Sequence, residues 1–224
     1  MKLFILAVSN TSRPVRVLIG EYKLPVEEIE LDFYKGEHAS EPYLTVNPNG
    51  LVPALVDGNF VLTESSAIMK YIADKFDLAV YPKELKARAK VNELMDWFNT
   101  GFYRDYAYNV VYPQIYPHHK RPDDQTQKGT IAWGRAQTRK WLKVLNEHWL
   151  GKGNRYLCGD ALTIADIFGA ALLTSGHVIR NEFGDYRNVD RWLKDVGRLP
   201  SWKGANAAVD GFREYVKDQE FATV

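Results

Sequence analysis

Asn-Pro-Asn-Gly-Leu-Val-Pro-Ala-Leu-Val-Asp-Gly-Asn-Phe-Val-Leu-Thr-Glu-Ser, residues 47–65, is the stretch of sequence that decides the fold. A short apolar run follows the Val-Pro pair at 52–53, and the Asp-Gly-Asn turn at 57–59 is typical of a β-hairpin. The second strand ends at the Glu-Ser pair at 64–65, where an amphipathic helix begins. The arrangement brings the backbone of Val52 and the head of this helix to one place, which suits a peptide-like ligand with a carboxylate.

The sequence on both sides extends this hairpin into a mixed α/β unit. Residues 3–8 form an apolar run that predicts a buried strand, and Pro14 fits the first turn of a helix. Residues 26–31 predict a second strand, and a short helix is expected near 41–44. The apolar face of residues 67–72 completes a β-α-β-α-β-β-α order, which is the thioredoxin-like layout with a mixed sheet.

The remainder of the chain predicts a second, all-helical domain. Residues 1–76 make up the α/β domain, residues 77–84 with Pro82 form a linker, and residues 85–224 carry no further strand signal. Apolar residues recur at helical spacing in two stretches of this domain, first at Val91, Leu94, Met95, Phe98 and Phe102, then at Trp133, Ala136, Trp141, Leu142 and Leu145.

The composition argues against a nucleic-acid-binding protein and against a membrane protein. The net charge of +1 over 224 residues provides no strong field for nucleic acid or an anionic membrane, and no apolar run reaches transmembrane length. Residues 1–8 resemble a short signal peptide, but polar residues follow without a cleavage pattern, so a buried strand is the better interpretation. The single cysteine, Cys158, suits a reducing compartment. We therefore expect a cytoplasmic protein.

The Glu64-Ser65 pair is the first candidate binding element. As a structural element alone, Ser65 would cap a helix that begins after Glu64. A helix N-terminus also attracts a carboxylate through its free N–H groups and its dipole, and Glu64 beside it can bind an amine. Together they match the free α-amino acid end of a peptide. In the thioredoxin-like layout the Val52-Pro53 bond is cis and turns the Val52 backbone outward, where it can pair with an extended peptide.

Ser12 is the candidate for chemistry, because it lies between the first strand and the first helix. On its own it could be a simple helix cap. Without a neighbouring histidine as base it is a poor nucleophile. A hydroxyl and helix N–H groups aimed at the sulfur of a ligand would instead favour thiolate over thiol, which makes the ligand the nucleophile.

These elements carry a resemblance to a known family. The residues concerned are Ser-x-Pro-x-Arg at 12–16, Lys-Gly-Glu-His at 35–38, the stretch 47–65, residues 81–91, and Tyr-Leu-Cys-Gly-Asp-Ala-Leu-Thr-Ile-Ala-Asp at 156–166. They resemble the theta and delta classes of the cytosolic glutathione transferases, including bacterial members. The likeness covers most of the chain and is most specific in the first domain.

The resemblance implies roles for individual residues. It implies that Ser12 activates the thiol of glutathione, with Asn10 as the alternative, since some bacterial relatives use an asparagine or threonine near this position. His38 would contact the glycyl end and Val52, before Pro53, the cysteinyl backbone. Glu64 and Ser65 would then bind the γ-glutamyl end. Theta-type proteins often carry a lysine at the position of Leu51, so one contact to the glycyl carboxylate is expected to be lost.

The second substrate is harder to predict from the sequence. An aromatic cluster, in which Phe102, Tyr103, Tyr106, Tyr108, Tyr112 and Tyr116 follow one another, lies near the end of the first long helix, which the prolines at 113, 117 and 122 are expected to end. Most of these rings are expected in the core or at the surface. Tyr103 and Tyr106 are the candidates for an acceptor pocket, where their hydroxyls could assist the electrophile.

Other motifs are expected to be structural. Thr163 and Asp166 form a capping box, and Cys158 is expected to be a small apolar group. The adjacent His118 and His119 cannot easily share one metal, so a solvated basic loop is preferred and no metal is expected.

The predicted function is conjugation of the glutathione thiolate to small hydrophobic electrophiles by a homodimer. Glutathione-dependent disulfide reduction or dehalogenation at the same site is an alternative. A non-catalytic binding or scaffold protein of the same fold is another, although the set Ser12, His38, Glu64 and Ser65 argues against it.

Overall fold

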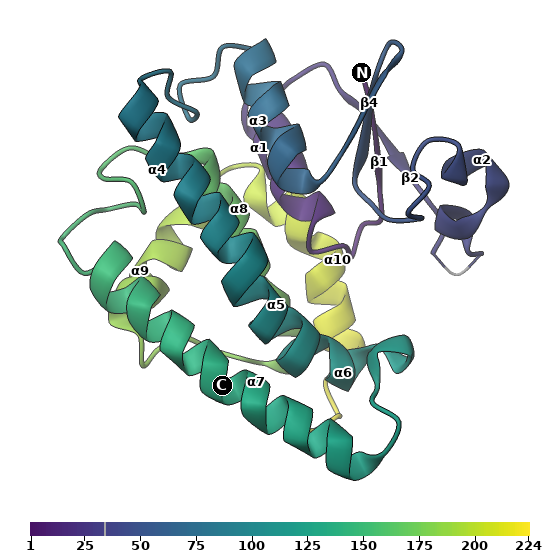
Figure 1. Cartoon of the computed structure of the whole chain (residues 1–224), viewed down its shortest axis with the longest axis vertical. Coiled ribbons are helices and arrows are strands. Elements are labelled where there is room, and N and C mark those ends of the chain that lie inside the picture. Colours follow the sequence, from purple (N-terminus) through teal and green to yellow (C-terminus); the bar gives the residue numbers. More distant parts are fainter. Residues whose placement is uncertain (34) are drawn as a thin grey trace.

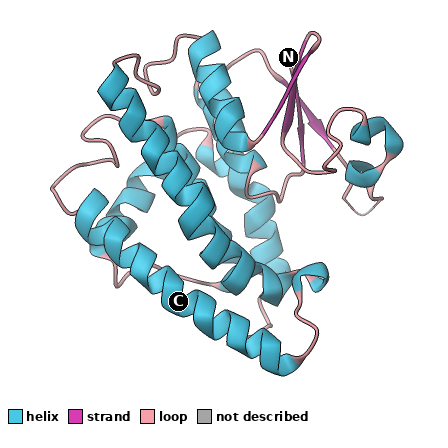
Figure 2. Ribbon diagram, in the orientation of Figure 1, coloured by secondary structure: helices cyan, strands magenta, loops and turns pink. Residues whose placement is uncertain are grey.

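A computed structural model describes residues 1–33 and 35–224, and it places all strands at one end of the molecule (Figure 2). The strands are β1 (Lys2–Ile5), β2 (Glu27–Glu30), β3 (Ala54–Asp57) and β4 (Phe60–Thr63). They form one sheet in the order β2-β1-β3-β4, in which β1 and β2 are parallel and the other pairs antiparallel. The predicted mixed sheet is confirmed.

Helices cover the sheet on both sides. The helices α1 (Ser12–Glu21) and α3 (Ser65–Lys75) lie between the sheet and the helical half, whereas α2 (Glu41–Leu44) lies on the opposite side (Figure 1). The fully buried Leu3 and Leu55 belong to the same hydrophobic core as Leu18 on α1 and Ile68 on α3. This core fixes the ends of α1 and α3 relative to the strands, and those helix ends position the site described below.

The second half of the chain is helical, as predicted. Its α-helices are α4 (Leu85–Asp96), α5 (Tyr103–Tyr106), α6 (Tyr112–Ile115), α7 (Asp124–Val144), α8 (Ile164–Leu173), α9 (Arg187–Val196) and α10 (Trp202–Tyr215). π-Helical turns span Trp97–Phe102, Ala107–Val111 and Leu145–Trp149, and 3₁₀ turns span Glu37–Ala39, Pro117–His119 and Thr174–Ile179. Every residue of α8 is buried, because α8 packs between α1 of the first half and α4 of the second.

The first long helical run ends just before Pro117, one of the prolines predicted to end it, but it passes through Pro113. It continues from α4 through two π-helical turns and α5 into α6, so Pro113 lies inside it. A proline costs a helix its missing N–H and a clash with the preceding turn, and it is tolerated in the first turn of a new helical segment. Pro113 is the second residue of α6, directly after the π-helical turn Ala107–Val111. The chain leaves the helix only at Tyr116.

The buried face of α7 also differs from the prediction. Trp133 and Ala136 are exposed, whereas Gly134 and Thr138 are buried with Leu142. A Cβ atom at Gly134 would lie 2.7 Å from the Cβ of Asn109, so the absence of a side chain lets α7 approach the neighbouring helix. The buried face of α7 is therefore the one whose small residues let the neighbouring helix approach closely, and not the one with the largest apolar side chains.

The capping box at the start of α8 is confirmed. The Asp166 carboxylate accepts hydrogen bonds from the backbone N–H and the hydroxyl of Thr163, each at 2.8 Å. It also accepts bonds from the backbone N–H of Leu157 at 2.8 Å and from the indole N–H of Trp192 on α9 at 2.9 Å. Asp166 thus joins three segments around the central helix.

Burial raises the pKa of the neighbouring Cys158 thiol to about 11, which keeps it protonated and unreactive.

None of the helices formed by residues 1–33 and 35–224 combines the length and the apolar character that crossing a membrane requires.

Candidate active site

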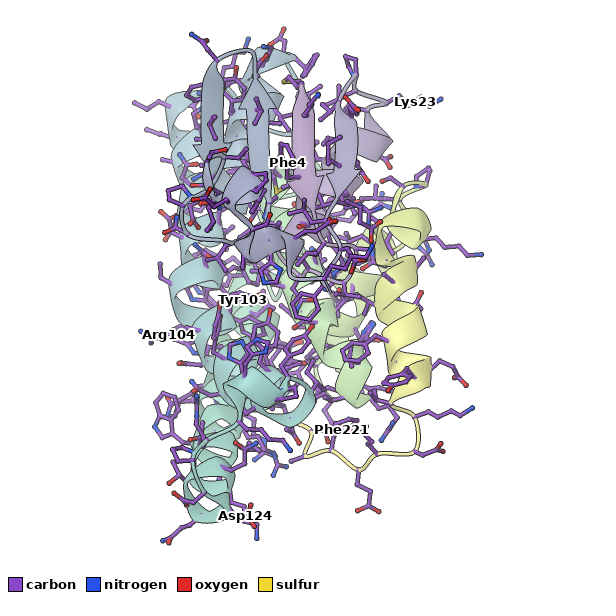
Figure 3. All side chains as sticks on the ribbon, turned by 90° about the vertical axis from the view of Figure 1, so that its right-hand side faces the viewer. Phe4, Lys23, Tyr103, Arg104, Asp124 and Phe221 are labelled. Carbon is purple, nitrogen blue, oxygen red and sulfur yellow. The ribbon has the colours of Figure 1, made fainter. Side chains whose placement is uncertain are left out.

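A cavity of about 750 Å³ lies between the two halves of the molecule. From the α/β half it is lined by Leu6, Val8, Ser9, Thr11, Phe33, His38, Asn47, Asn49, Gly50, Leu51, Val52, Pro53, Thr63, Glu64 and Ser65. From the helical half it is lined by Asn99, Thr100, Tyr103, Arg104, Tyr108, Tyr112, Tyr116, His118 and His119. In Figure 3, Phe4 marks the sheet, and Tyr103 lies below it in the helical half, while Arg104 extends outward at the edge.

The loop before β3 contributes backbone groups to this cavity. The Val52-Pro53 bond is cis, as predicted. The Thr11 hydroxyl donates a hydrogen bond to the carbonyl oxygen of Val52 at 3.0 Å, which ties the loop to the start of α1. The carbonyl oxygen of Leu51 accepts bonds from Tyr43 and Asn47, each at 2.6 Å. These bonds hold the peptide units before and after Val52 in fixed positions.

Glu64 and Ser65 lie at the start of α3 and both line the cavity. Glu64 has φ 64° and ψ 111°, a backbone conformation that is uncommon outside glycine. Such conformations persist where the surrounding structure demands them and gather at binding sites. Glu64 itself is the N-cap residue and Ser65 the first helical residue, so the expectation that Ser65 caps the helix is wrong by one position. A carboxylate and a helix N-terminus therefore face the same cavity.

His38 lines the far end of the same wall. Its ring stacks on Phe33 with centroids 5.3 Å apart. Its Nδ1 atom is buried and has no hydrogen-bond partner within the described part of the chain. Gly50 stands close by with φ 63°, and a Cβ there would lie 3.2 Å from the carbonyl oxygen of His38. The imidazole is thus a polar group held at the wall of the cavity.

Ser12 does not line the cavity, which corrects the prediction that it faces the ligand. It is the first residue of α1 and is completely buried. Its hydroxyl oxygen has no hydrogen-bond partner among residues 1–33 and 35–224. The sequence pattern placed a serine at the head of α1 correctly, but the helix turns that side chain into the protein interior.

Ser9 and Thr11 occupy the position in the cavity that was predicted for Ser12. The Ser9 hydroxyl oxygen accepts a hydrogen bond from the backbone N–H of Ser12 at 3.2 Å and lies 3.1 Å from the Thr11 hydroxyl oxygen. Because the single Thr11 proton is donated to Val52, the bond between the two hydroxyls requires the Ser9 proton. The three-residue spacing of Ser9 and Ser12 is the signal that could have identified this turn from the sequence.

Asn10, the alternative activating residue, is also turned away from the cavity. It is 7% exposed, its amide nitrogen donates to the Tyr112 hydroxyl at 2.9 Å, and its oxygen accepts from Arg13 at 2.7 Å. Both polar atoms are thus engaged inside the protein. The expectation that Asn10 contacts the thiol is therefore corrected as well.

On the helical side, the structure separates the two predicted tyrosines. Tyr103 lines the cavity, whereas Tyr106 is completely buried and does not. The Tyr106 hydroxyl occupies the space that a side chain at Gly176 would need. Desolvation by burial raises its pKa, so the hydroxyl stays neutral. Tyr106 is a core residue, and the prediction that it lines the acceptor pocket is wrong.

Several residues of the helical wall were not predicted. Tyr112 and Tyr116 pack ring to ring at 5.3 Å, and His119 packs against Tyr112 at 5.1 Å. His118 is exposed and also lines the cavity, so the loop is solvated as predicted but contributes to the cavity wall as well. Burial, with the neighbouring charge of His118, lowers the pKa of His119 and favours its neutral, more apolar form.

No cluster of three or more histidine, cysteine or acidic side chains arranged to hold a metal ion occurs in the described ranges.

Comparison with known proteins decides the family. A family model described as the glutathione S-transferase N-terminal domain matches residues 1–74, and one described as the C-terminal domain matches residues 112–200. The chain belongs to the glutathione S-transferase family.

Individual glutathione transferases are similar along almost their whole length. The human theta-2B protein is 29% identical over 214 residues, which cover 91% of this chain and 79% of that protein. The solved structure of human theta-2, a complex with glutathione and an unknown ligand, superposes with a TM-score of 0.82 at 26% identity over 100% of this chain and 93% of that one. A delta-class transferase from Nilaparvata lugens superposes with a TM-score of 0.79 at 27% identity over 97% and 98% of the two chains.

Proposed function

We propose that this transferase binds glutathione in the α/β half of the cavity and conjugates its thiolate to small hydrophobic electrophiles held by the helical half. The observation that carries the proposal is the convergence of two helix starts and the Val52 loop on one cavity. Glu64 and Ser65 are suited to the γ-glutamyl end, the Val52 backbone to the cysteinyl unit, and His38 to the glycyl end. The solved complex of the human theta-2 protein with glutathione supports the binding of glutathione.

Ser9 is the residue that we propose to stabilise the thiolate. Its oxygen is held by the N–H of Ser12, and its proton points toward Thr11 in the absence of a ligand. A sulfur in the cavity would accept this proton instead of the Thr11 oxygen. A hydrogen bond to the anionic form lowers the pKa of a thiol, and the positive end of the α1 dipole acts in the same direction. The thiolate, which is the reactive form, would then predominate near neutral pH.

The chemical step needs little more from the protein than this. The thiolate attacks the electrophilic carbon, a carbon–sulfur bond forms, and a leaving group departs with its electron pair or a π pair moves to a neighbouring atom. Holding both reactants in one cavity replaces a bimolecular encounter by an oriented approach. The aromatic rings of Tyr108, Tyr112 and Tyr116 offer an apolar surface for the acceptor.

The test compares two serines at the same helix start. We expect Ser9→Ala to lower kcat/KM for glutathione with chlorodinitrobenzene by about 100-fold, because it removes the donor to the developing anion. Ser12→Ala, which deletes a buried hydroxyl outside the cavity, is the matched control and should change this value by less than about threefold. The ultraviolet band of the glutathione thiolate appears as the bound thiol loses its proton. The midpoint of this titration should move to higher pH in Ser9→Ala and not in Ser12→Ala. Equal losses in both variants would exclude Ser9 as the activating residue.

The alternatives predict different products from the same protein. A disulfide reductase or dehalogenase would turn over a glutathione mixed disulfide or a haloalkane faster than chlorodinitrobenzene. A scaffold protein would be retained on immobilised glutathione but would form no conjugate. Measuring all three rates with one preparation separates these possibilities.

We also propose that the protein acts as a homodimer in the cytoplasm. The exposed apolar side chains of Phe60 and Val61 on the edge strand β4 support a second chain covering this edge of the sheet. Light scattering of the purified protein would test it, and a monomer at micromolar concentration would contradict it.

A further inference from the structure

Arg13 is a buried cation directly behind the wall of the cavity. Its backbone N–H donates to the carbonyl oxygen of Ser9 at 3.2 Å, and its guanidinium donates to the side-chain oxygen of Asn10 at 2.7 Å. The Asn10 amide nitrogen in turn donates to the Tyr112 hydroxyl at 2.9 Å. Because Ser9 and Tyr112 both line the cavity, a single amide group separates the guanidinium from the cavity wall.

The hydrogen-bond partners of Arg13 are all neutral. The guanidinium also donates to the hydroxyl of Thr174 at 3.1 Å, to the carbonyl oxygen of Ala171 at 2.6 Å and to the side chain of Asn206. Arg13 is completely buried and belongs to no ion pair in the described part of the chain, where its Nε atom also lacks a hydrogen-bond partner. Burial lowers its pKa only to about 10, so it stays charged at neutral pH. Buried charges are normally paired, and this one leaves a net positive charge behind the cavity.

The titratable groups around Arg13 leave this charge uncancelled at neutral pH. Those that act on it electrostatically are Tyr103, Tyr112, Tyr116, His177 and Asp210. A phenol is uncharged at pH 7, and burial raises the pKa of Tyr103 and of Tyr112 further. Burial lowers the pKa of His177 to about 4, so this imidazole is neutral as well. Asp210 is exposed on α10, where solvent screens its charge.

We propose that the positive charge of Arg13 favours the thiolate of bound glutathione over the thiol, through space and without contact with the ligand. The inference rests on the proposed binding of glutathione and adds a long-range charge to the hydrogen bond that we propose for Ser9. The proton that the thiol loses passes to solvent. A unit charge that acts over roughly 10 Å in a protein interior, with an effective dielectric constant of about 20, changes an ionisation constant by about tenfold.

Other titratable groups line the cavity and act on the same thiol. They are His38, Glu64, Tyr103, Arg104, Tyr108, Tyr112, Tyr116, His118 and His119. The charge of Glu64 opposes the thiolate, whereas that of the exposed Arg104 supports it. A test of Arg13 must therefore leave the lining of the cavity unchanged. Asn206 allows this, because it is buried on α10, contacts the guanidinium and is not part of the lining.

The experiment gives Arg13 a counter-ion from outside the cavity. Asn206→Asp keeps the shape of the side chain and places a carboxylate against the guanidinium, which cancels the net charge behind the cavity. We expect the midpoint of the thiolate titration of bound glutathione, followed by its ultraviolet band, to rise by about one pH unit. Below both midpoints, kcat/KM for glutathione with chlorodinitrobenzene should fall about tenfold. The loss should vanish above the higher midpoint, where the thiol is ionised in both proteins.

The matched control changes the same residue without adding a charge. The Asn206 amide also donates to the carbonyl oxygen of Trp202 at 2.7 Å, and Asn206→Asp and Asn206→Ala both lose this bond. Asn206→Ala should lower the melting temperature but leave the midpoint within about 0.3 pH units, because the charge of Arg13 is kept. As a second variant, Arg13→Met removes the charge itself and should raise the midpoint at least as far as Asn206→Asp. A merely structural role for Arg13 would change the melting temperature and spare the midpoint.

Two outcomes would overturn the inference. If the midpoint in Asn206→Asp equals that of the unaltered protein, the charge of Arg13 does not act on the thiol. If Asn206→Ala raises the midpoint as far as Asn206→Asp does, the effect comes from lost packing and not from charge. Neither outcome affects the proposed function, which fails separately if the unaltered protein does not bind glutathione or forms no conjugate.

Discussion

The two walls of the cavity are built in different ways. The α/β wall presents backbone groups, a helix start and the short loops of residues 47–53 and 36–38, all held by the sheet. The helical wall presents long aromatic side chains from one helical run and the turn after it. A backbone wall can bind only a ligand of fixed shape, whereas a side-chain wall changes with each substitution. This difference suits one constant thiol and a variable electrophile.

Arg13 on α1 joins the two halves of the molecule, so replacing it should have the largest effect. Arg13→Ala removes hydrogen bonds to Thr174, Ala171 and Asn206 of the helical half and leaves buried acceptors unpaired. We expect the free energy of unfolding to fall by about 3 kcal/mol. Urea denaturation measures this. Arg16→Ala, one turn further along α1, removes an ion pair with Glu28 and a single 3.4 Å bond to the Ala205 carbonyl oxygen of the helical half, so it should cost about 1 kcal/mol or less. Similar losses would show that Arg13 does not bridge the halves.

The α/β wall is tested by removing a charge from the head of α3. Glu64→Gln keeps the shape of the side chain but cannot attract an ammonium group, so glutathione should bind about 2 kcal/mol more weakly, on the order of 30-fold. The KM of the electrophile should not change. Titration calorimetry gives the glutathione Kd, and Glu27→Gln, on the outer strand β2, is the control. If only the KM of the electrophile increased, Glu64 would act on the electrophile and not on glutathione, which would contradict this prediction.

Acid should destabilise the protein through the helical half. Burial, with the positive charges of Arg13 and Arg213, lowers the pKa of His177 to about 4, below its usual value of about 6.5. Between these values the unfolded chain binds more protons than the folded one, so stability is complete above pH 6.5 and falls as the pH drops toward 4. The expected loss at pH 5 is about 2 kcal/mol relative to pH 7.

His177→Gln should flatten this pH dependence, and unfolding by urea at several pH values measures it. His148, which is exposed, serves as the control, because His148→Gln should keep the dependence of the unaltered protein. A steep loss that persists in His177→Gln would trace the acid sensitivity to another group.

The helical wall should respond to changes in single rings. His119→Ala removes a ring that packs against Tyr112 and lines the cavity, so the KM of a hydrophobic electrophile should rise about fivefold, or about 1 kcal/mol. The glutathione Kd should stay within twofold. His148→Ala, outside the cavity, is the control. A change in the glutathione Kd as large as that in KM would show that the two walls are not separable.

Leu51 provides the smallest and sharpest test. This residue is 65% exposed and lines the cavity. Leu51→Lys should add a surface attraction to the glycyl carboxylate and lower the glutathione Kd about threefold, or about 0.6 kcal/mol. The gain should disappear in 1 M salt. Leu85→Lys, at a leucine that is 79% exposed and lies outside the cavity, should not change the Kd.

The α/β wall could be predicted from the sequence because its signals are local. The cis proline, the turn at 57–59 and the start of α3 each follow from residue types at fixed offsets. Accordingly His38, Val52, Pro53, Glu64 and Ser65 all line the cavity. The misses at this wall, Ser12 and Asn10 in place of Ser9, concern which side of a helix start faces outward. The three-residue spacing of Ser9 and Ser12 indicates the turn between them, but the residue types alone do not show which hydroxyl faces the cavity.

The helical wall could not be predicted in the same way. A regular helix would place Tyr103 and Tyr106 on one face, three residues apart. Both residues lie within the regular turn α5, where three residues correspond to about 300° of rotation, so the two rings point about 60° apart. Which of them faces the cavity is decided by the packing around the helix, and the π-helical turns on both sides of α5 hide that orientation from a count along the sequence. The histidines at 118 and 119 reach the cavity only through the tertiary placement of their turn, for which the sequence holds no local signal.

The same π-helical turns have a consequence for how this transferase can change. A π-helical turn accommodates one residue more than an α-helical turn, and it is commonly tolerated as a single-residue insertion. Deleting one residue from Trp97–Phe102 would let this turn return to α-helical spacing, so that residues within the turn change face while the helix on either side keeps its orientation. Such a deletion would present a new set of side chains to the electrophile while the thiol site, on another part of the chain, kept its form. Length variation in this helix is therefore a route to new acceptors that point substitutions do not offer.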